Sequence, residues 1–304
     1  MRLEHFLRHE RVDILHTHKF GSNAWGTLVG KMARVPVVLA HEHTWSYKGQ
    51  PLRRFVDREI IARGADSFIA VSREDQRRMT EIERIDPSRT RFLPIGILPS
   101  PRPTGVDIRA ELGIEPSVPI IGIVAILRPQ KAHHVLLRAV AQLTGDWPNI
   151  QLLIVGDGPE RATLEQLIGD LRLQDNVRIL GLRSDVPDIL HAIDIAACSS
   201  DFEGSPLAVL EYMDAALPVV ATAVGGIPDL IEPRVHGLLV PPGDSSALAK
   251  ALGELLRDPK YAREMGERAQ KRRHAEFDLR VVIRRLEDLY CELLAQRGRP
   301  LPGG

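Results

Sequence analysis

The chain has 304 residues with 40 Lys and Arg against 40 Asp and Glu, and its formal net charge is therefore zero. At roughly 100 to 200 residues per domain, this length indicates two domains, each large enough to bury a core. Zero net charge without a long basic block argues against nucleic acid as a main partner, because phosphate binding requires a surplus of Lys and Arg on one face.

The cysteine content and the opening sequence bear on the compartment. Cys198 and Cys291 lie far apart and in no metal-type spacing, which excludes a disulfide scaffold and is typical of a reducing environment. The opening MRLEHFLRHER has no apolar stretch of the signal-peptide kind, and no long apolar window predicts a membrane span. We therefore expect a cytoplasmic protein.

The first hundred residues alternate short apolar runs with amphipathic ones, the pattern of parallel β-α units. Residues before 12 resemble the end of a helix. The pattern predicts strands at 12–17, 36–41, 67–72 and 91–94, and helices at 22–34, 52–63 and 73–83. The Pro- and Gly-rich stretch 93–105 then predicts a linker.

The second part predicts a complete doubly wound domain. Strands are expected at 120–126, 150–156, 176–180, 193–199, 218–223 and 237–241, and helices at 131–143, 159–172, 185–192, 206–216, 226–232 and 246–256, before a mostly helical tail to about 296. We accordingly predict a partial first domain at 1–100, a second domain at 101–275, and a C-terminal helix and tail at 276–304. Open sheets of this kind bind ligands at the carboxyl ends of their strands.

The segment 201–231 contains the strongest chemical signal. It turns through Glu203, Gly204 and Ser205 and enters a helix, with Ser205 predicted as N-cap and Pro206 at the first helical position. A helix N-terminus after glycine favours an anion such as phosphate. Glu211 lies about 12 Å along the helix from Glu203, so the two carboxylates could bracket a diphosphate with a sugar at each end. The structural alternative is that both are solvated helix residues.

Two loops of the second part add further candidates. Arg128 and Lys131 follow the strand 120–126 and could clamp phosphate, although exposed loop cations are commonly just solvated. Gly156, in VGDGPE after the next strand, permits a tight turn and close approach of a ligand. The alternative is that the glycines and proline here serve only to start the following helix. This is no G-x-G-x-x-G motif, so a nicotinamide site is poorly supported.

Histidines gather in the first part. His16 and His18 end one predicted strand, and His41 and His43 end the next, so each pair shares one face if extended. One interpretation is that these imidazoles only satisfy backbone groups at the strand ends. A sharper rival is a metal site, since H-x-H and H-E-H together supply up to five ligands.

The run EGSPLAVLE at 203–211 resembles the E-x7-E motif of the retaining glycosyltransferases of the GT-B fold, specifically the large family 4. VGDGPE, LGLRSDVPDIL, PVVATAVGGIPDLI and GLLVPPGD resemble that family in the same order, as do DILHTH and PVVLAHEHTW near the N-terminus. The likeness covers 12–295 and implies an α/β chain with two Rossmann-like doubly wound domains facing a cleft, the first of them incomplete.

The resemblance implies roles for individual residues. The second domain would hold a nucleotide-sugar donor, with Glu203 on the sugar hydroxyls, Glu211 on the ribose, and Lys131 neutralising the leaving diphosphate. The remaining donor-binding residues would be Gly156, Gly204, Ser205, Leu207 and Arg128, the last as a substitute because Ile126 occupies the usual Arg position. A His of the first domain would touch the donor sugar near the reacting carbon: His43 is our choice, with His41 second and His18 less certain.

The function predicted from this likeness is retaining transfer of a sugar from a UDP- or GDP-sugar to a hydroxyl of a glycan or lipid-linked acceptor, in polysaccharide or glycolipid biosynthesis. No cofactor and no metal would be needed. The first domain would bind the acceptor. Rival readings are a sugar-nucleotide epimerase and an H-x-H metal hydrolase.

A third rival is a truncated, non-catalytic subunit that binds nucleotide sugar and needs a complementing N-terminal chain. Family members usually begin with a strand, a Gly-rich loop and further β-α units before the region that matches DILHTH, and we find no match to these. Ile95 stands where the family usually has Asn in P-N-G-I. The Arg-rich stretches 51–63 and 73–79 fit either peripheral contact with an anionic membrane or a solvated helix face.

Overall fold

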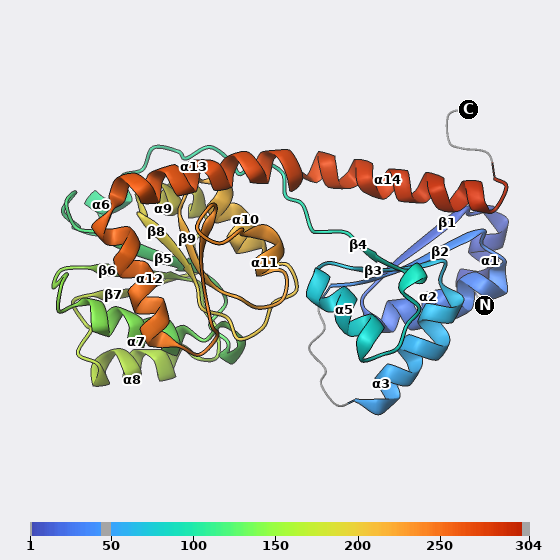
Figure 1. The fold of residues 1–304 in the computed structure, drawn as a ribbon, viewed down its shortest axis with the longest axis horizontal. Coiled ribbons are helices and arrows are strands. Elements are labelled where there is room, and N and C mark those ends of the chain that lie inside the picture. The colour runs from blue at the N-terminus through green and yellow to red at the C-terminus, as the bar shows by residue number, and fades with distance from the viewer. Residues whose placement is uncertain (1, 44–49, 300–304) are drawn as a thin grey trace. The chain divides into compact units, whose positions relative to one another are not determined.

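The computed structural model describes residues 2–43 and 50–299 and divides the chain into two compact units (Figure 1). The first unit combines the N-terminal residues up to Gly96 with the C-terminal segment from Leu279, and the second spans Ile97–Asp278. Within the described ranges, no helix is both long and apolar enough to cross a membrane.

The first unit contains a parallel sheet in the order β1-β2-β3-β4. Its strands are β1 (Ile14–His18), β2 (Val37–Glu42), β3 (Ser67–Ala70) and β4 (Thr90–Phe92). They are the four strands that the alternation predicted, displaced by one or two residues. In the register of β1 and β2, His18 lies opposite His41. The histidine-bearing ends of these two strands are therefore neighbours.

Short helices connect these strands. They are α1 (Arg2–His9), α2 (Phe20–Ala33), α3 (Pro51–Val56), the π-helical η1 (Asp57–Ile61), α4 (Ala62–Gly64), α5 (Arg73–Glu81) and the 3-10 turn η2 (Pro87–Arg89). The helix expected over 52–63 is therefore not a continuous α-helix, because a π-helical turn interrupts it. That turn contains Asp57, whose side chain is fully buried, so an acidic residue faces inward in this segment.

The C-terminal helix α14 (Leu279–Gln296) belongs to the first unit. Its apolar residues Val282, Leu289 and Leu293 pack against Val37 and Leu39 of β2. The sequence analysis set residues 276–304 apart as a terminal segment. The structure instead uses part of that segment to cover one face of the first sheet, a long-range contact that no local pattern indicates.

The second unit contains a six-stranded parallel sheet in the order β10-β9-β8-β5-β6-β7. Its strands are β5 (Ile120–Val124), β6 (Gln151–Val155), β7 (Val177–Gly181), β8 (Ile195–Cys198), β9 (Val219–Thr222) and β10 (Gly237–Val240). All six lie within the ranges predicted from the sequence, apart from one residue at the end of β7. The chain order reverses between β5 and β8, and this reversal is where ligands of doubly wound sheets bind.

Helices cover both faces of the second sheet. They are α6 (Ile108–Glu111), η3 (Pro129–Lys131), α7 (His133–Leu143), α8 (Arg161–Asp170), α9 (Val186–Ala192), α10 (Leu207–Asp214), α11 (Ile227–Leu230), α12 (Ser245–Arg257) and α13 (Pro259–Glu276). One core lies under α7, α8 and α12, and the other under α9, α10 and α11. Neighbouring residues such as Ile120 and Ile121 enter opposite cores, as strand alternation requires.

Candidate functional site

An ion pair stands at the reversal point of the second sheet. Lys131 lies in the loop after β5 and Glu203 in the loop after β8, and the Lys131 Nζ is 2.5 Å from the Glu203 Oε1. The lysine side chain is 21% exposed and the glutamate 7%. The two loops thus place a mostly buried cation and carboxylate together at the carboxyl ends of the two central strands.

Hydrogen bonds hold these two loops in register. The Ser200 hydroxyl donates to the Glu203 Oε1 at 2.6 Å, and the Ser199 hydroxyl donates to the Lys131 backbone oxygen at 2.9 Å. Gln130 adds a side-chain bond of 2.8 Å to the Phe202 carbonyl oxygen. The two serines and Gln130 were missed by the sequence analysis. The run of small polar residues directly after a buried strand was the available signal.

The turn after β9 packs against the backbone of the Glu203 loop. The amide of Gly226 donates to the Gly204 carbonyl oxygen at 2.7 Å. Gly225 has a φ of +54°, and a Cβ at this position would lie 1.8 Å from the Glu203 carbonyl oxygen. Only glycine satisfies both demands, so the AVGG sequence fixes the backbone that carries Glu203.

The structure corrects the predicted start of the following helix. α10 begins at Leu207 with Pro206 as its N-cap, and no side chain caps it. Ser205, predicted as N-cap, has a buried Oγ that hydrogen-bonds no atom of the described chain. The proline holds an extended backbone there, so the helix starts two residues after the serine. Glu211 lies in α10, and burial, with Asp214 nearby, raises the pKa of its carboxyl above the ordinary value.

The remaining donor-site candidates lie in the loops after β5 and β6. Arg128 is exposed at the start of η3, just ahead of Lys131. Gly156 has a φ of +136°, and a Cβ there would lie 2.1 Å from the Ala125 carbonyl oxygen. Gly156 therefore lets the β6 loop lie against the β5 loop.

A buried histidine lies next to Lys131. His133 is 2% exposed, and neither ring nitrogen hydrogen-bonds within the described residues. Burial, with the positive charge of Lys131 and the proximity of His134, lowers the pKa of His133 to about 4. The ring is therefore neutral at pH 7.

The histidines of the first unit form one cluster. The His18 Nδ1 and the His43 Nε2 are 2.9 Å apart, and the rings of His16 and His41 stack with centroids 5.4 Å apart. The Tyr290 hydroxyl lies 2.7 Å from the His16 Nδ1, a partner from α14 that the sequence did not indicate. The structure thus brings together all four histidines that strand alternation placed at the two strand ends.

These imidazoles are held neutral by their surroundings. Burial, reinforced by the neighbouring histidines, lowers the pKa of His41 to about 2 and that of His16 to about 4. Burial also lowers the pKa of His18 and of His43 below the ordinary value. At pH 7 the cluster therefore offers uncharged ring nitrogens.

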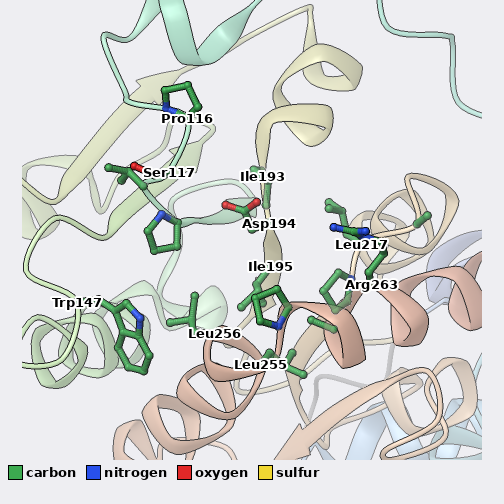
Figure 2. Close-up of a pocket in the computed structure, with 16 residues that line it drawn as sticks. Pro116, Ser117, Trp147, Ile193, Asp194, Ile195, Leu217, Leu255, Leu256 and Arg263 are labelled. Atoms are coloured by element: carbon green, nitrogen blue, oxygen red, sulfur yellow. The ribbon is translucent and has the colours of Figure 1, made fainter.

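A cavity of about 450 Å³ lies at the other end of the second sheet (Figure 2). Pro119, Asp194 and Pro218, which line it, directly precede or lie next to the first residues of β5, β8 and β9, at their amino ends. Trp147 and Leu256 give it an apolar wall. Its lining contains Arg263 but neither Lys131 nor Glu203, so this cavity is separate from the ion pair at the reversal point.

Comparison with known proteins identifies the family. The family model described as glycosyl transferases group 1 matches residues 106–272, and that of glycosyltransferase family 4 matches residues 1–100. The chain belongs to the group 1 glycosyl transferases. The matched region 106–272 contains Lys131, Glu203 and Glu211, so the ion pair at the reversal point lies in the part that defines the family.

Individual relatives similar to this chain are also named as glycosyltransferases or as synthases of glycosylated products. D-inositol 3-phosphate glycosyltransferase of Corynebacterium jeikeium is 31% identical over 327 residues, covering 98% of this chain and 78% of the relative. N-acetyl-alpha-D-glucosaminyl L-malate synthase of Bacillus anthracis is 32% identical over 188 residues, covering 62% of this chain and 49% of the relative. The match to this chain thus spans about half the length of one relative and about three quarters of the other.

A solved structure shows the same fold. Anabaena HepE in complex with UDP aligns with a TM-score of 0.88 at 24% identity, covering 96% of this chain and 81% of HepE. The predicted fold class is confirmed: this is an α/β chain with two parallel sheets that matches GT-B glycosyltransferase structures.

Proposed function

We propose that the chain binds a nucleotide-sugar donor in its second unit and transfers the sugar to a hydroxyl group of an acceptor, with retention at the anomeric carbon. The observation that carries this proposal is the Lys131–Glu203 pair at the reversal point of the second sheet, 2.5 Å apart. The pair lies inside the region that matches the glycosyl transferase model. The ammonium group of Lys131 suits the phosphates of a nucleotide sugar, and the carboxylate of Glu203 suits its polyhydroxylated ring.

In the proposed complex, Lys131 exchanges its carboxylate partner for the diphosphate. Its ammonium group and the free amides at the start of α10 then stabilise the negative charge that grows as the bond between the anomeric carbon and the phosphate oxygen breaks. Glu203 accepts hydrogen bonds from the sugar hydroxyls, and Glu211 does so from the ribose. The acceptor oxygen attacks on the face that the diphosphate leaves, so no protein nucleophile is needed.

Other residues take supporting roles in this proposal. Gly204, Ser205 and Leu207 present backbone to the diphosphate, Gly156 presents its own backbone to the donor beside the β5 loop, and Arg128 adds a second cation. Ser205 also has a buried side-chain hydroxyl that is unpaired within the described chain, and we propose that it donates to the diphosphate as well.

His43 is proposed to contact the donor sugar. It keeps this role ahead of His41, which is 7% exposed and therefore less accessible to any ligand. His18 holds the His43 ring through the 2.9 Å contact between their nitrogens. We expect His43→Ala to lower the rate of transfer while leaving donor affinity of the second unit nearly unchanged.

Variants of the ion pair test the proposed activity. We expect Lys131→Ala and Glu203→Gln each to abolish most transfer from UDP- or GDP-sugars to a hydroxyl acceptor. The matched controls Lys250→Ala and Glu267→Gln, both exposed on helices, should keep wild-type turnover. Turnover like wild type in either site variant would refute the assignment.

Product analysis separates the alternatives. A retaining transferase keeps the anomeric configuration in the product, which proton NMR reports directly. A sugar-nucleotide epimerase would instead change the donor with no acceptor present. For the transfer step itself we propose no cofactor and no metal, so a chelator should leave turnover unchanged.

Membrane contact is a second, peripheral proposal, for a protein that we place in the cytoplasm. Leu52 and Phe55 of α3 are 76% and 53% exposed, beside the arginines of the same segment. Exposed apolar residues next to cations suit an anionic membrane surface that carries a lipid-linked acceptor. We expect co-sedimentation with anionic vesicles that Leu52→Ser with Phe55→Ser abolishes, and equal pelleting of wild type and variant would refute it.

A complementing N-terminal segment is also proposed. β1 ends the strand order of the first sheet, so its outer edge pairs with no strand of the described residues. On α1 and α2, Phe6 is 55%, Trp25 71% and Met32 52% exposed. A preceding strand and helix, on the same or a separate chain, would pair this edge and cover these residues. We expect turnover to rise when upstream sequence is added, and no change would refute this.

A further inference from the structure

Three of the four clustered histidines, His16, His18 and His41, lie close enough together to bind one metal ion. One nitrogen each from His16, His18 and His41 lies within 4.8 Å of the other two. Two imidazole nitrogens bound to one zinc ion at about 2.0–2.1 Å lie no more than about 4 Å apart. Side-chain rotations that move the nitrogens by about 1 Å would therefore bring all three within bonding distance of one ion. The three residues sit on neighbouring strands of one parallel sheet, which fixes their backbones.

Unsatisfied nitrogens within the cluster point to a missing ligand. The ring of His41, 7% exposed, has neither nitrogen hydrogen-bonded within the described residues, and the His16 Nε2 is buried and equally unpaired. Buried polar atoms are nearly always satisfied in native proteins, and each orphan normally has an explanation such as an ion. A metal ion would bond the His16 Nε2 and one of the two His41 nitrogens.

His16 also has the outer partner that metal-binding histidines usually have. Its Nδ1 is engaged by the Tyr290 hydroxyl at 2.7 Å, which leaves the Nε2 facing the cluster as the free nitrogen. Such a second hydrogen bond fixes the orientation of the ring and its tautomer. His18 has a similar partner in His43.

We propose that His16, His18 and His41 bind one divalent transition-metal ion, Zn²⁺ under cellular conditions. Three neutral imidazoles favour zinc, copper or nickel over magnesium and calcium, which require oxygen ligands. With three protein ligands, the fourth tetrahedral position is open to water, or to His43 if its ring moves.

The role proposed for this ion is structural. It would join β1, an edge strand, to β2 by bonds additional to the ladder between them. It binds the folded first unit and not the unfolded chain, so it raises stability as any such ligand does. The ion takes no part in the proposed transfer chemistry, although its ligand His18 also contacts His43. A zinc-loaded and a zinc-free chain would both bind donor in the second unit.

Zinc titration of the chain tests the proposal. After dialysis against a chelator, calorimetric titration with Zn²⁺ should give one site per chain. His18→Gln, which removes an exposed ligand and leaves the core intact, should weaken binding about tenfold or more. Tyr290→Phe, a positioning change, should weaken it less, and the exposed control His191→Gln should bind like wild type.

Two measurements distinguish a loss of zinc binding from a loss of folding. Zn²⁺ should raise the thermal midpoint of wild type and of His191→Gln but not of His18→Gln, and the visible absorption of Co²⁺ should report nitrogen ligands in the same pattern. Binding that persists unchanged in both His18→Gln and His16→Gln would overturn the proposal, as would the absence of binding by wild type. Transfer assays do not enter this test, so failure of one proposal leaves the other standing.

Discussion

Breaking the Lys131–Glu203 pair from either side should destabilise the second unit. The two atoms are 2.5 Å apart, and Glu203 accepts a further bond of 2.6 Å from Ser200. Lys131→Met keeps the apolar stem of the lysine and removes its charge, whereas Glu203→Gln keeps the shape of the carboxylate. Each change leaves the other charge without its partner in a mostly buried position.

The magnitude follows from this burial. A hydrogen bond to a charged group contributes about 1.5–3 kcal/mol, and removing one partner of a fully buried pair costs about 3–5 kcal/mol. Because the Lys131 side chain is 21% exposed, we expect less than the cost for a fully buried pair, about 2–3 kcal/mol for either single variant. The double variant should cost about the same as a single one, since the second change removes the stranded charge.

Urea denaturation followed by far-ultraviolet circular dichroism measures this directly. With a slope of about 2 kcal/mol per M, each single variant should lower the midpoint by roughly 1–1.5 M. Lys250→Met, on an exposed face of α12, should leave the midpoint unchanged. Additive effects of the two site variants, or midpoints like that of the control, would refute the view that these groups form one coupled pair.

Three further changes probe the second unit. The folded-state pKa of His133, about 4, lies below the ordinary 6.5, so the unfolded chain binds more protons between these values and stability falls as pH drops from about 6.5 to 4. His133→Leu should remove this pH dependence, which amounts to at most about 3 kcal/mol of unfolding free energy between about pH 4 and 6.5. Urea midpoints measured against pH report it, and an unchanged slope in the variant would contradict the burial of a neutral ring. Gly225→Ala would put a Cβ 1.8 Å from the Glu203 carbonyl oxygen, and we expect loss of donor binding by calorimetry with circular dichroism retained; normal affinity would refute the close approach. Arg273, fully buried, lies 3.2 Å from Asp214, and Arg273→Met should cost about 3–5 kcal/mol in urea denaturation, whereas a neutral effect would mean the pair contributes nothing net.

The strands and their order in the chain were predictable because local patterns determine them. The apolar run before Lys131 and the one before Glu203 became β5 and β8, and the strand-end histidines met because parallel neighbours share an end. Short-range turn chemistry was less readable: proline rather than serine precedes α10, because an extended proline backbone delayed the helix. The π-helical turn at Asp57 also lay outside what periodicity can express.

Long-range partners could not be predicted. Tyr290 is 274 residues from His16, and nothing in its surroundings indicates that contact. Likewise, the pairing of Lys131 with Glu203 depends on the strand order, in which β5 lies beside β8 and not only beside β6. A sequence presents these loops as separate candidates, and only the sheet makes them one site.

Calorimetric binding of nucleotide sugars tests the central claim most directly. We predict that the wild-type chain binds one molecule of a UDP- or GDP-sugar, that Lys131→Ala and Glu203→Gln weaken this binding about tenfold or more, and that Lys250→Ala leaves it unchanged. Failure of the wild-type chain to bind any nucleotide sugar, or equal affinity in Lys131→Ala, would contradict the account.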